Sequence, residues 1–288
     1  MRKRLRDKLS ENLSAETLSK VSNSFDIIGD IAIIKIICSN IADAERVAKK
    51  IMDVHRNIKT VLTPVTCITG DFRVRELSLL AGEDKTSTLH KESGCIFMVD
   101  VEKTYFSPRL SFEHQRIASL VKSNETVVNM FAGVGCFSII IAKTVSPVRV
   151  YSIDVNPTAL KCMEENVNIN KVQGSVFPIL GDSKDIISTQ LGGIADRVLM
   201  PLPEKALEYL PYALSALKPS GGMIHYYDFQ HAPGKENPVE KTKLKVAKKL
   251  DNLGVSYVFV NSRVMRPTGP NWYQTVLDIQ VDALPSKF

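Results

Sequence analysis

Thr126-Val-Val-Asn-Met-Phe-Ala-Gly-Val-Gly135 is the stretch that decides the fold. It begins with an apolar strand-like run and ends in a turn with two glycines, and a helical pattern over residues 137–143 follows. A strand, a glycine turn and a helix form the opening unit of a parallel α/β sheet, and the glycines let the backbone approach a ligand closely. We therefore predict a doubly wound α/β domain in this part of the chain.

The residues on either side continue the alternation of strands and helices. A helical pattern over residues 157–170 has Asn156 as its N-cap and Pro157 at its first position. Further strand-like runs are found at 148–153, 176–180 and 197–200. Strands that alternate with helices imply a parallel sheet, and ligands bind such sheets at the carboxyl ends of the strands.

The ends of these strands carry the residues of a nucleotide-type cofactor site. The turn lacks the third glycine of a dinucleotide fingerprint, because Ser138 stands in its place. Asp154 follows about 20 residues later and can accept hydrogen bonds from a ribose, whereas Asp182 is placed to accept from an adenine amino group. This order of features resembles the class I methyltransferase fold, whose cofactor is S-adenosylmethionine. The expected cofactor contacts are Phe131, Gly133, Gly135, Asp154, Val155, Asp182, Ser183 and Pro201.

The residues before this domain have a different character. Residues 1–23 are polar and basic and predict a short arm. Residues 24–100 contain short strand-like runs, among them 72–77, and one helical pattern at 41–51, which together predict a small α+β domain with a mostly antiparallel sheet. We expect residues 101–288 to form the methyltransferase domain.

Composition limits the class of protein. The 288 residues include 37 Lys and Arg against 31 Asp and Glu, a net charge of +6 that is compatible with a polyanionic partner. The five cysteines are odd in number and far apart, which fits neither a disulfide framework nor a metal site and favours the cytoplasm. No apolar run reaches the length of about 20 residues that a membrane span needs. We predict a monomer that binds no metal or membrane.

One segment resembles a known family. Tyr105-Phe-Ser-Pro-Arg-Leu-Ser-Phe-Glu-His-Gln-Arg-Ile117, followed by the glycine turn, is similar to the archaeal and eukaryotic tRNA (guanine-N1)-methyltransferases that modify guanosine 37 beside the anticodon. The similarity extends over about residues 24–280. The family also commonly carries a separate N-terminal domain that grips the tRNA elbow. About 20 residues stand in its place here, so this domain is missing, has been removed, or was never present.

The resemblance implies roles for particular residues. Guanine N1 is protonated at neutral pH, so the reaction needs a base near N1 and a cation or hydrogen-bond donor near O6. Matching positions make Glu113 the base and Arg73 the O6 partner. Arg75 stays an alternative, because two residues that are two apart on a strand share a face. His114 is expected to contact the cofactor. The structural alternative for Glu113 is a solvated helix residue paired with Arg116 or Arg109.

One position departs from the family pattern. The family has Asn before Leu-Pro after the fourth strand, and this chain has Pro201, which has no side-chain amide to contact guanine. The change leaves open an enzyme of the wyosine pathway, which would methylate a tricyclic base at position 37 or transfer an aminocarboxypropyl group to it. A non-catalytic RNA-binding protein is a further alternative. We predict the guanosine methyltransferase, with residues 24–100 positioning its RNA and with Asp196 or His114 as a substitute base if Glu113 is not the base. Residues 263–272 predict either an RNA-contacting loop or an edge-strand connection with a packing Trp272.

Overall fold

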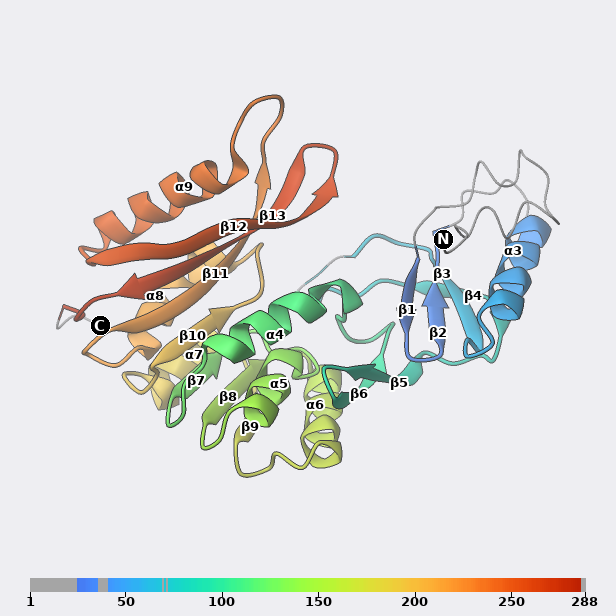
Figure 1. The fold of residues 1–288 in the computed structure, drawn as a ribbon, viewed down its shortest axis with the longest axis horizontal. Helices are drawn as coiled ribbons and strands as arrows, with labels where there is room; N and C mark the ends of the chain where they lie inside the picture. Colours follow the sequence, from blue (N-terminus) through green and yellow to red (C-terminus); the bar gives the residue numbers. More distant parts are fainter. Residues whose placement is uncertain (1–24, 36–40, 69, 71, 286–288) are drawn as a thin grey trace.

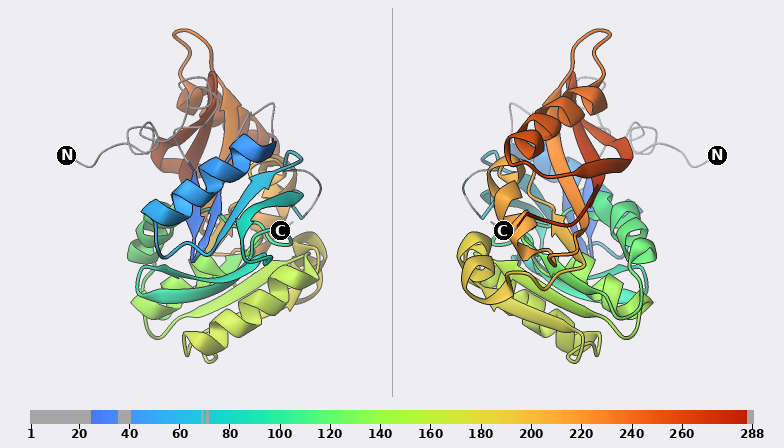
Figure 2. Two further views of the ribbon diagram at one scale, coloured as in Figure 1. Left: turned by 90° about the vertical axis from the view of Figure 1, so that its right-hand side faces the viewer. Right: turned by 90° about the vertical axis from the view of Figure 1, so that its left-hand side faces the viewer.

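The computed structural model describes residues 25–35, 41–68, 70 and 72–285. Figure 1 shows a large sheet with helices on both faces beside a smaller sheet that carries one helix, and Figure 2 shows the same two parts end-on. No helix in the described part of the chain is long and apolar enough to cross a membrane.

Among the described residues, the small part consists of one helix and four strands. Its elements are β1 (Asp26–Ile28), β2 (Ile31–Ile33), α3 (Ile41–Val54), β3 (Thr60–Pro64) and β4 (Leu77–Gly82). The sheet order is β1-β2-β3-β4, with antiparallel pairs at both ends and a parallel β2–β3 pair between them. The helix predicted at 41–51 is confirmed. The strand predicted over 72–77 is wrong, because β4 begins only at Leu77, Phe72 and Arg73 lie in a turn, and Val74 forms only an isolated bridge.

A separate hairpin connects the small part to the large sheet. It consists of β5 (Ser87–Glu92) and β6 (Cys95–Asp100). On one side, Thr88 Oγ1 donates to Asp30 at 2.7 Å. On the other side, the hairpin contacts α6 (Pro157–Ile169). Oδ1 of Asn170, the C-cap residue of this helix, accepts from the backbone N–H of Ile96 at 2.9 Å. The hairpin therefore joins both parts, and the domain boundary at residue 100 stays a prediction.

The large part contains a seven-stranded sheet. Its remaining elements are the 3₁₀-helix η1 (Pro108–Leu110), α4 (Ser111–Leu120), β7 (Thr126–Asn129), α5 (Cys136–Thr144), β8 (Arg149–Asp154), β9 (Val176–Leu180), α7 (Ser183–Ile186), the π-helix η2 (Ile187–Leu191), β10 (Arg197–Met200), α8 (Ala206–Ala216), β11 (Gly222–His231), α9 (Pro238–Asn252), β12 (Tyr257–Gly269) and β13 (Trp272–Val281).

The sheet order is β12-β13-β11-β10-β7-β8-β9, and the five strands from β11 to β9 run parallel. The chain order reverses between β7 and β10. At such a switch point two neighbouring crossovers leave in opposite directions and open a crevice at the carboxyl ends of the strands. The doubly wound fold predicted from the sequence is confirmed, and the crevice marks where a ligand should bind.

The central strands of the large sheet bury alternate side chains on opposite faces. Tyr227 belongs to the core beneath α4, α5 and α6, whereas its neighbour Tyr226 belongs to the core beneath α8 and α9. The small sheet does the same with Ile33 and Ile34: Ile34 packs with α3 and Ile33 joins the core of the large part. One continuous core therefore holds the small sheet against the α4–α6 face.

Candidate active site

A cavity that is open to solvent lies at the switch point of the sheet. This position, at the carboxyl ends of the strands, suits a small ligand or cofactor. The residues that line it come from the strand ends of the large sheet, from the turn before β4 and from the segment before α4. They are Phe72, Arg73, Tyr105, Met130, Phe131, Gly133, Asp154, Val155, Asn156, Ala159, Gly181, Asp182, Ser183, Pro201, Leu202, Lys205 and Tyr209.

Asp154 ends β8 and faces the glycine turn. Its Oδ2 accepts from the backbone N–H of Gly133 at 2.6 Å, and its Oδ1 accepts from the N–H of Asn156 at 2.9 Å. Burial raises the pKa of this carboxyl, although the backbone hydrogen bonds oppose the change. Since each carboxylate oxygen has two acceptor sites, both oxygens can still accept a hydroxyl donor from the cavity.

Asp182 plays a structural part as well as lining the cavity. Its Oδ1 accepts from the N–H of Lys184 at 3.0 Å and caps α7, and the Tyr209 hydroxyl donates to the same carboxylate at 2.9 Å. The Tyr209 ring also packs edge-on against Phe131 with centroids 5.3 Å apart. Asp182, Tyr209 and Phe131 therefore form one wall of the cavity. Tyr209 was not predicted, because in the sequence it is one of several apolar residues of a buried helix.

The two glycines of the turn have different environments. Gly133 has φ +56° and lines the cavity. Gly135 has φ +91° and is the N-cap of α5, and a side chain there would approach Met163 Cγ to 2.9 Å. Gly135 is therefore required for the backbone conformation and for packing. The structure does not place it in the cavity lining, and its predicted cofactor contact stays a prediction.

His114 also lies away from the cavity lining. Its ring is buried, and its Nδ1 donates to the buried Glu92 carboxylate at 2.6 Å. Phe137 packs edge-on against it at 4.4 Å. These contacts join α4 to the hairpin and to α5. The structure thus gives His114 a packing environment, and its contact with the cofactor stays a prediction.

Glu113 is 2% exposed and accepts four hydrogen bonds. Arg116 donates Nε to Oε2 at 2.9 Å and Nη2 to Oε1 at 2.7 Å, and the Tyr227 hydroxyl donates to Oε1 at 2.8 Å. The fourth donor is Nη2 of Arg263, which reaches across from β12. The pairing with Arg116 considered from the sequence is therefore present, but Glu113 is buried rather than solvated. It is outside the cavity lining, and these four donors occupy all the acceptor sites of its two carboxylate oxygens.

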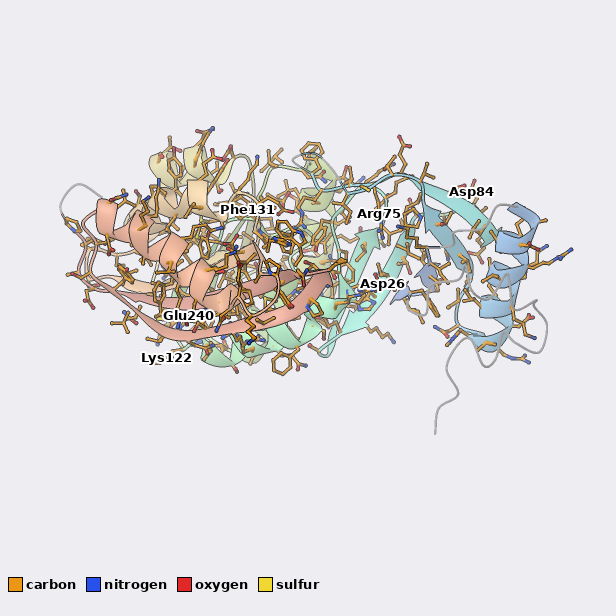
Figure 3. The ribbon with its side chains drawn as sticks, turned by 90° about the horizontal axis from the view of Figure 1, so that it is seen from above. Asp26, Arg75, Asp84, Lys122, Phe131 and Glu240 are labelled. Carbon is orange, nitrogen blue, oxygen red and sulfur yellow. The ribbon has the colours of Figure 1, made fainter. Side chains whose placement is uncertain are left out.

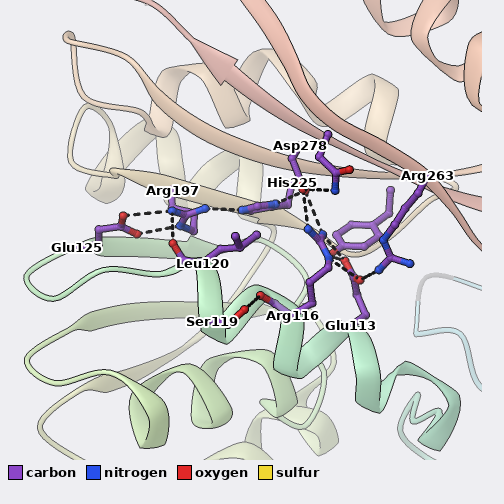
Figure 4. A network of polar contacts seen from close by, with 11 residues as sticks. Glu113, Arg116, Ser119, Leu120, Glu125, Arg197, His225, Arg263 and Asp278 are labelled. Atoms are coloured by element: carbon purple, nitrogen blue, oxygen red, sulfur yellow. Dashed lines mark hydrogen bonds and ion pairs between the residues drawn. The ribbon is translucent and has the colours of Figure 1, made fainter.

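A buried chain of polar groups continues from Arg116 (Figure 4). Arg116 Nη1 donates to Asp278 at 2.6 Å, His225 Nδ1 donates to Asp278, and Arg197 donates to His225 Nε2 at 2.6 Å. Because an arginine can only donate, His225 is neutral with its proton on Nδ1. Burial alone would raise the pKa of Asp278, but the hydrogen bonds from His225 and Arg116 hold it well below its usual range. His225 is thus a core residue with both nitrogens in hydrogen bonds.

Arg73 does not lie on a strand. It occupies a turn with φ +51°, so the argument that Arg73 and Arg75 share the face of a strand is wrong. The Arg73 guanidinium stacks on the Tyr105 ring at 4.1 Å and its Nη2 lies 3.2 Å from Glu204 Oε1. Arg75 does not line the cavity, and in Figure 3 it is seen near Asp26, apart from Phe131. The structure therefore brings Arg73, and not Arg75, to the cavity.

Other predicted features have structural roles or different conformations. Arg109 forms an ion pair with Asp26 at 2.8 Å. Asp196 lies at the opposite end of the sheet, where it accepts from the N–H of Thr126 at 2.8 Å, so it is not a substitute base at this cavity. Residues 263–272 form the end of the edge strand β12, a turn and the start of β13, so the edge-strand connection is confirmed and the RNA contact stays a prediction. Among the described residues, no group of three or more His, Cys, Asp or Glu side chains is arranged to hold a metal ion.

A profile of the TRM5/TYW2 methyltransferase domain matches residues 88–255, more than half of the chain. The chain belongs to this family. A profile of the TYW2 N-terminal domain matches residues 5–86. The family resemblance found in the sequence and the class I methyltransferase fold are therefore confirmed.

Relatives within the TRM5/TYW2 family have different names. The chain is 41% identical to the tRNA (guanine(37)-N(1))-methyltransferase Trm5b of Pyrococcus abyssi, over 94% of this chain and 78% of the relative. It is 36% identical to the tRNA 4-demethylwyosine(37)-methyltransferase Taw21 of Saccharolobus solfataricus, over 89% of this chain and 93% of the relative.

Solved structures in the TRM5/TYW2 family contain tRNA or the cofactor. A complex of aTrm5 with tRNALeu is similar with a TM-score of 0.82 and 32% identity, over 98% of this chain and 79% of that one. The TYW2 of M. jannaschii in complex with AdoMet is similar with a TM-score of 0.66 and 30% identity, over 91% of this chain and 100% of that one. S-adenosylmethionine is thus the cofactor indicated by the family, and tRNA is the indicated partner.

Proposed function

We propose that this protein transfers the methyl group of S-adenosylmethionine to N1 of guanosine 37, in the anticodon stem-loop of tRNA. One observation carries the proposal: Asp154 and Gly133, which suit a nucleoside cofactor, line the same cavity as Arg73, which suits a guanine O6. A relative that covers nearly the whole chain bears the name of this activity. The predicted cytoplasmic location and monomeric state stay predictions.

The residues present fit S-adenosylmethionine. The Asp154 carboxylate keeps an acceptor site on each oxygen for the ribose hydroxyls, and the Phe131 ring and Val155 provide apolar surface in the cavity. Asp182 and Ser183 lie at the end of the neighbouring strand, and the buried Ser183 Oγ has no hydrogen-bond partner among the described residues. When bound, this cofactor supplies a methyl group on a positively charged sulfur.

Two side chains act on the guanine. Arg73 donates to O6, where negative charge develops as N1 loses its proton. Glu113 accepts that proton, and for this one of its four donors must release an acceptor site. Arg263 is the donor best suited to leave, because its side chain is 29% exposed and comes from the edge strand β12, whereas Arg116 is held by two carboxylates.

Nucleoside mass spectrometry tests the proposal. A tRNA transcript with guanosine at position 37, incubated with enzyme and S-adenosylmethionine, should yield N1-methylguanosine. A transcript with adenosine at position 37 is the control and should yield none. If the guanosine transcript stays unmodified while the enzyme binds both tRNA and cofactor, guanosine is not the substrate.

A second candidate is methylation of a tricyclic wyosine precursor at position 37. Pro201 lines the cavity and cannot supply the amide of the family's Asn, and the Taw21 relative matches over 93% of its length. The same mass-spectrometric assay, run on tRNA that carries 4-demethylwyosine, distinguishes the two candidates. The mass added to the base also separates methyl transfer from aminocarboxypropyl transfer.

A further inference from the structure

Arg73 forms an ion pair with Glu204, an acid that has no part in the chemistry described above. Arg73 comes from the turn before β4, and Glu204 comes from the segment between β10 and α8, three residues after Pro201. Their Nη2 and Oε1 atoms lie 3.2 Å apart. Leu202 and Lys205, which flank Glu204 at close range, line the cavity. The pair therefore sets a donor and an acceptor side by side at the edge of the cavity.

The two members of the pair are held differently. Arg73 is 14% exposed, stacks on Tyr105, and has a buried Nε with no hydrogen-bond partner among the described residues. A buried donor without a partner is costly, so Arg73 is poised to donate to an acceptor that enters the cavity. Glu204 is 50% exposed, and its carboxylate can turn without breaking a buried contact. An exposed ion pair of this kind contributes little to stability.

The Watson–Crick edge of guanine is complementary to this pair. It presents one acceptor, O6, followed by two donors, N1–H and the exocyclic N2 amino group. A guanidinium beside a carboxylate is complementary to this edge, because the guanidinium can donate to O6 and the carboxylate can accept from an N–H group. We propose that Glu204 is a specificity-determining residue that accepts from the guanine N2 amino group while Arg73 donates to O6. This inference rests on the proposed function.

The replacement of the family's Asn by Pro201 gives Glu204 this task. At position 201 only backbone atoms can meet the base, so a polar side chain for the N2 edge must come from a neighbouring position. Glu204 is the acidic side chain that the structure places against Arg73. The acceptor site that Arg263 frees on Glu113 is taken by the N1 proton, and Arg116 and Tyr227 occupy the other sites, so the N2 amino group needs a second acceptor.

Inosine separates recognition of N2 from recognition of O6, since it keeps O6 and N1–H and lacks only the N2 amino group. We would measure single-turnover methylation at subsaturating enzyme for tRNA transcripts with guanosine or inosine at position 37. Loss of one charge-assisted hydrogen bond lowers the rate by about 10- to 100-fold, and the wild type should prefer guanosine by this factor. In Glu204→Ala the preference should fall to within about threefold of unity, and Glu204→Gln, which keeps a neutral acceptor, should be intermediate.

Glu208→Ala is the matched control, because Glu208 is an exposed acid one turn further along the chain, on α8, and does not line the cavity. It should keep the wild-type preference. If Glu204→Ala slows both transcripts by the same factor, Glu204 only orients Arg73 and the proposal is overturned. An equal rate of the wild type on both transcripts overturns it as well.

Failure of the proposed function would look different, because the wild type would then methylate neither transcript. In that case the affinities of both transcripts are compared in the presence of S-adenosylhomocysteine, a probe that allows no transfer. A preference for guanosine that is lost in Glu204→Ala would still support recognition by Glu204. An equal affinity of the wild type for both transcripts would refute it.

Discussion

The decisive perturbation of the proposed chemistry is Glu113→Gln, because glutamine keeps the shape of the side chain and cannot take a proton. A general base typically contributes about 10²–10⁴-fold to a rate. The substitution should therefore lower the single-turnover methylation rate by this factor, while the affinities for cofactor and tRNA stay near their wild-type values.

The surroundings of Glu113 predict a second effect of the same change. Removal of one partner from a buried ion pair costs about 3–5 kcal/mol of stability. The cost here should lie at the lower end of that range, because Arg116 keeps Asp278 and the part-exposed Arg263 can turn toward water. The glutamine amide also places donor hydrogens against an arginine. Reduced activity alone would thus not distinguish a lost base from a weakened fold.

Asp278→Asn is the control that separates the two effects. Asp278 is also buried and also accepts four hydrogen bonds, two from Arg116 and one each from His225 and Asn261. Its loss should lower the free energy of unfolding by a similar amount, measured by urea titration. If Glu113 is the base, Asp278→Asn keeps the base and only loosens the Arg116 that positions it. It should therefore lose at most about tenfold in methylation rate, less than Glu113→Gln, at a temperature where both variants are folded. Equal rate losses in the two variants, or a wild-type rate in Glu113→Gln, would refute the assignment.

Three further predictions address the cofactor, the acid stability and the RNA. Asp154→Ala should weaken S-adenosylmethionine binding by about 1.5–3 kcal/mol, because a charged hydrogen-bond acceptor for the ribose is lost; unchanged affinity by calorimetry would contradict the role of Asp154. The pKa of Asp278 is lowered in the folded protein, so this carboxylate contributes stability above its unfolded pKa of about 3.9 that is lost as the pH falls. The free energy of unfolding from urea titrations should therefore decline below about pH 4, and the decline should be smaller in Asp278→Asn. The affinity for tRNA should fall with salt with a log–log slope of a few units, and a flat response by filter binding would argue against phosphate contacts.

The sequence predicted the cofactor half of the site better than the substrate half. Asp154, Asp182 and Gly133 each follow an apolar strand, and the carboxyl ends of parallel strands converge at a switch point, so their proximity follows from the fold class. Arg73 and Arg75 lie outside this regular framework. Which of the two faces the cavity depends on a turn with positive φ at Arg73. The residue pattern around Arg73 predicted a strand and did not indicate this turn.

The partners of Glu113 could not be predicted for a related reason. Arg116 is three residues away on the same helix and was identified, since residues at this spacing are neighbours on a helix. Arg263 is 150 positions away and lies on β12, the edge strand next to β13 and β11. Its contact with Glu113 depends on this strand order, which the sequence does not show. Tyr227 comes from β11, where alternation places it on the same face of the sheet as His225.

This distribution of partners bears on how the proposed base can work. Tyr227 and Arg116 are held by the core and by Asp278, so they fix the position of the Glu113 carboxylate, whereas Arg263 comes from the sheet edge and lies over the exposed ring of Phe112 at 5.6 Å. An incoming anticodon loop offers phosphates that compete with Glu113 for the Arg263 guanidinium. Binding of RNA at this edge would then release the acceptor site that the reaction needs, so the base would become competent only when its substrate is in place.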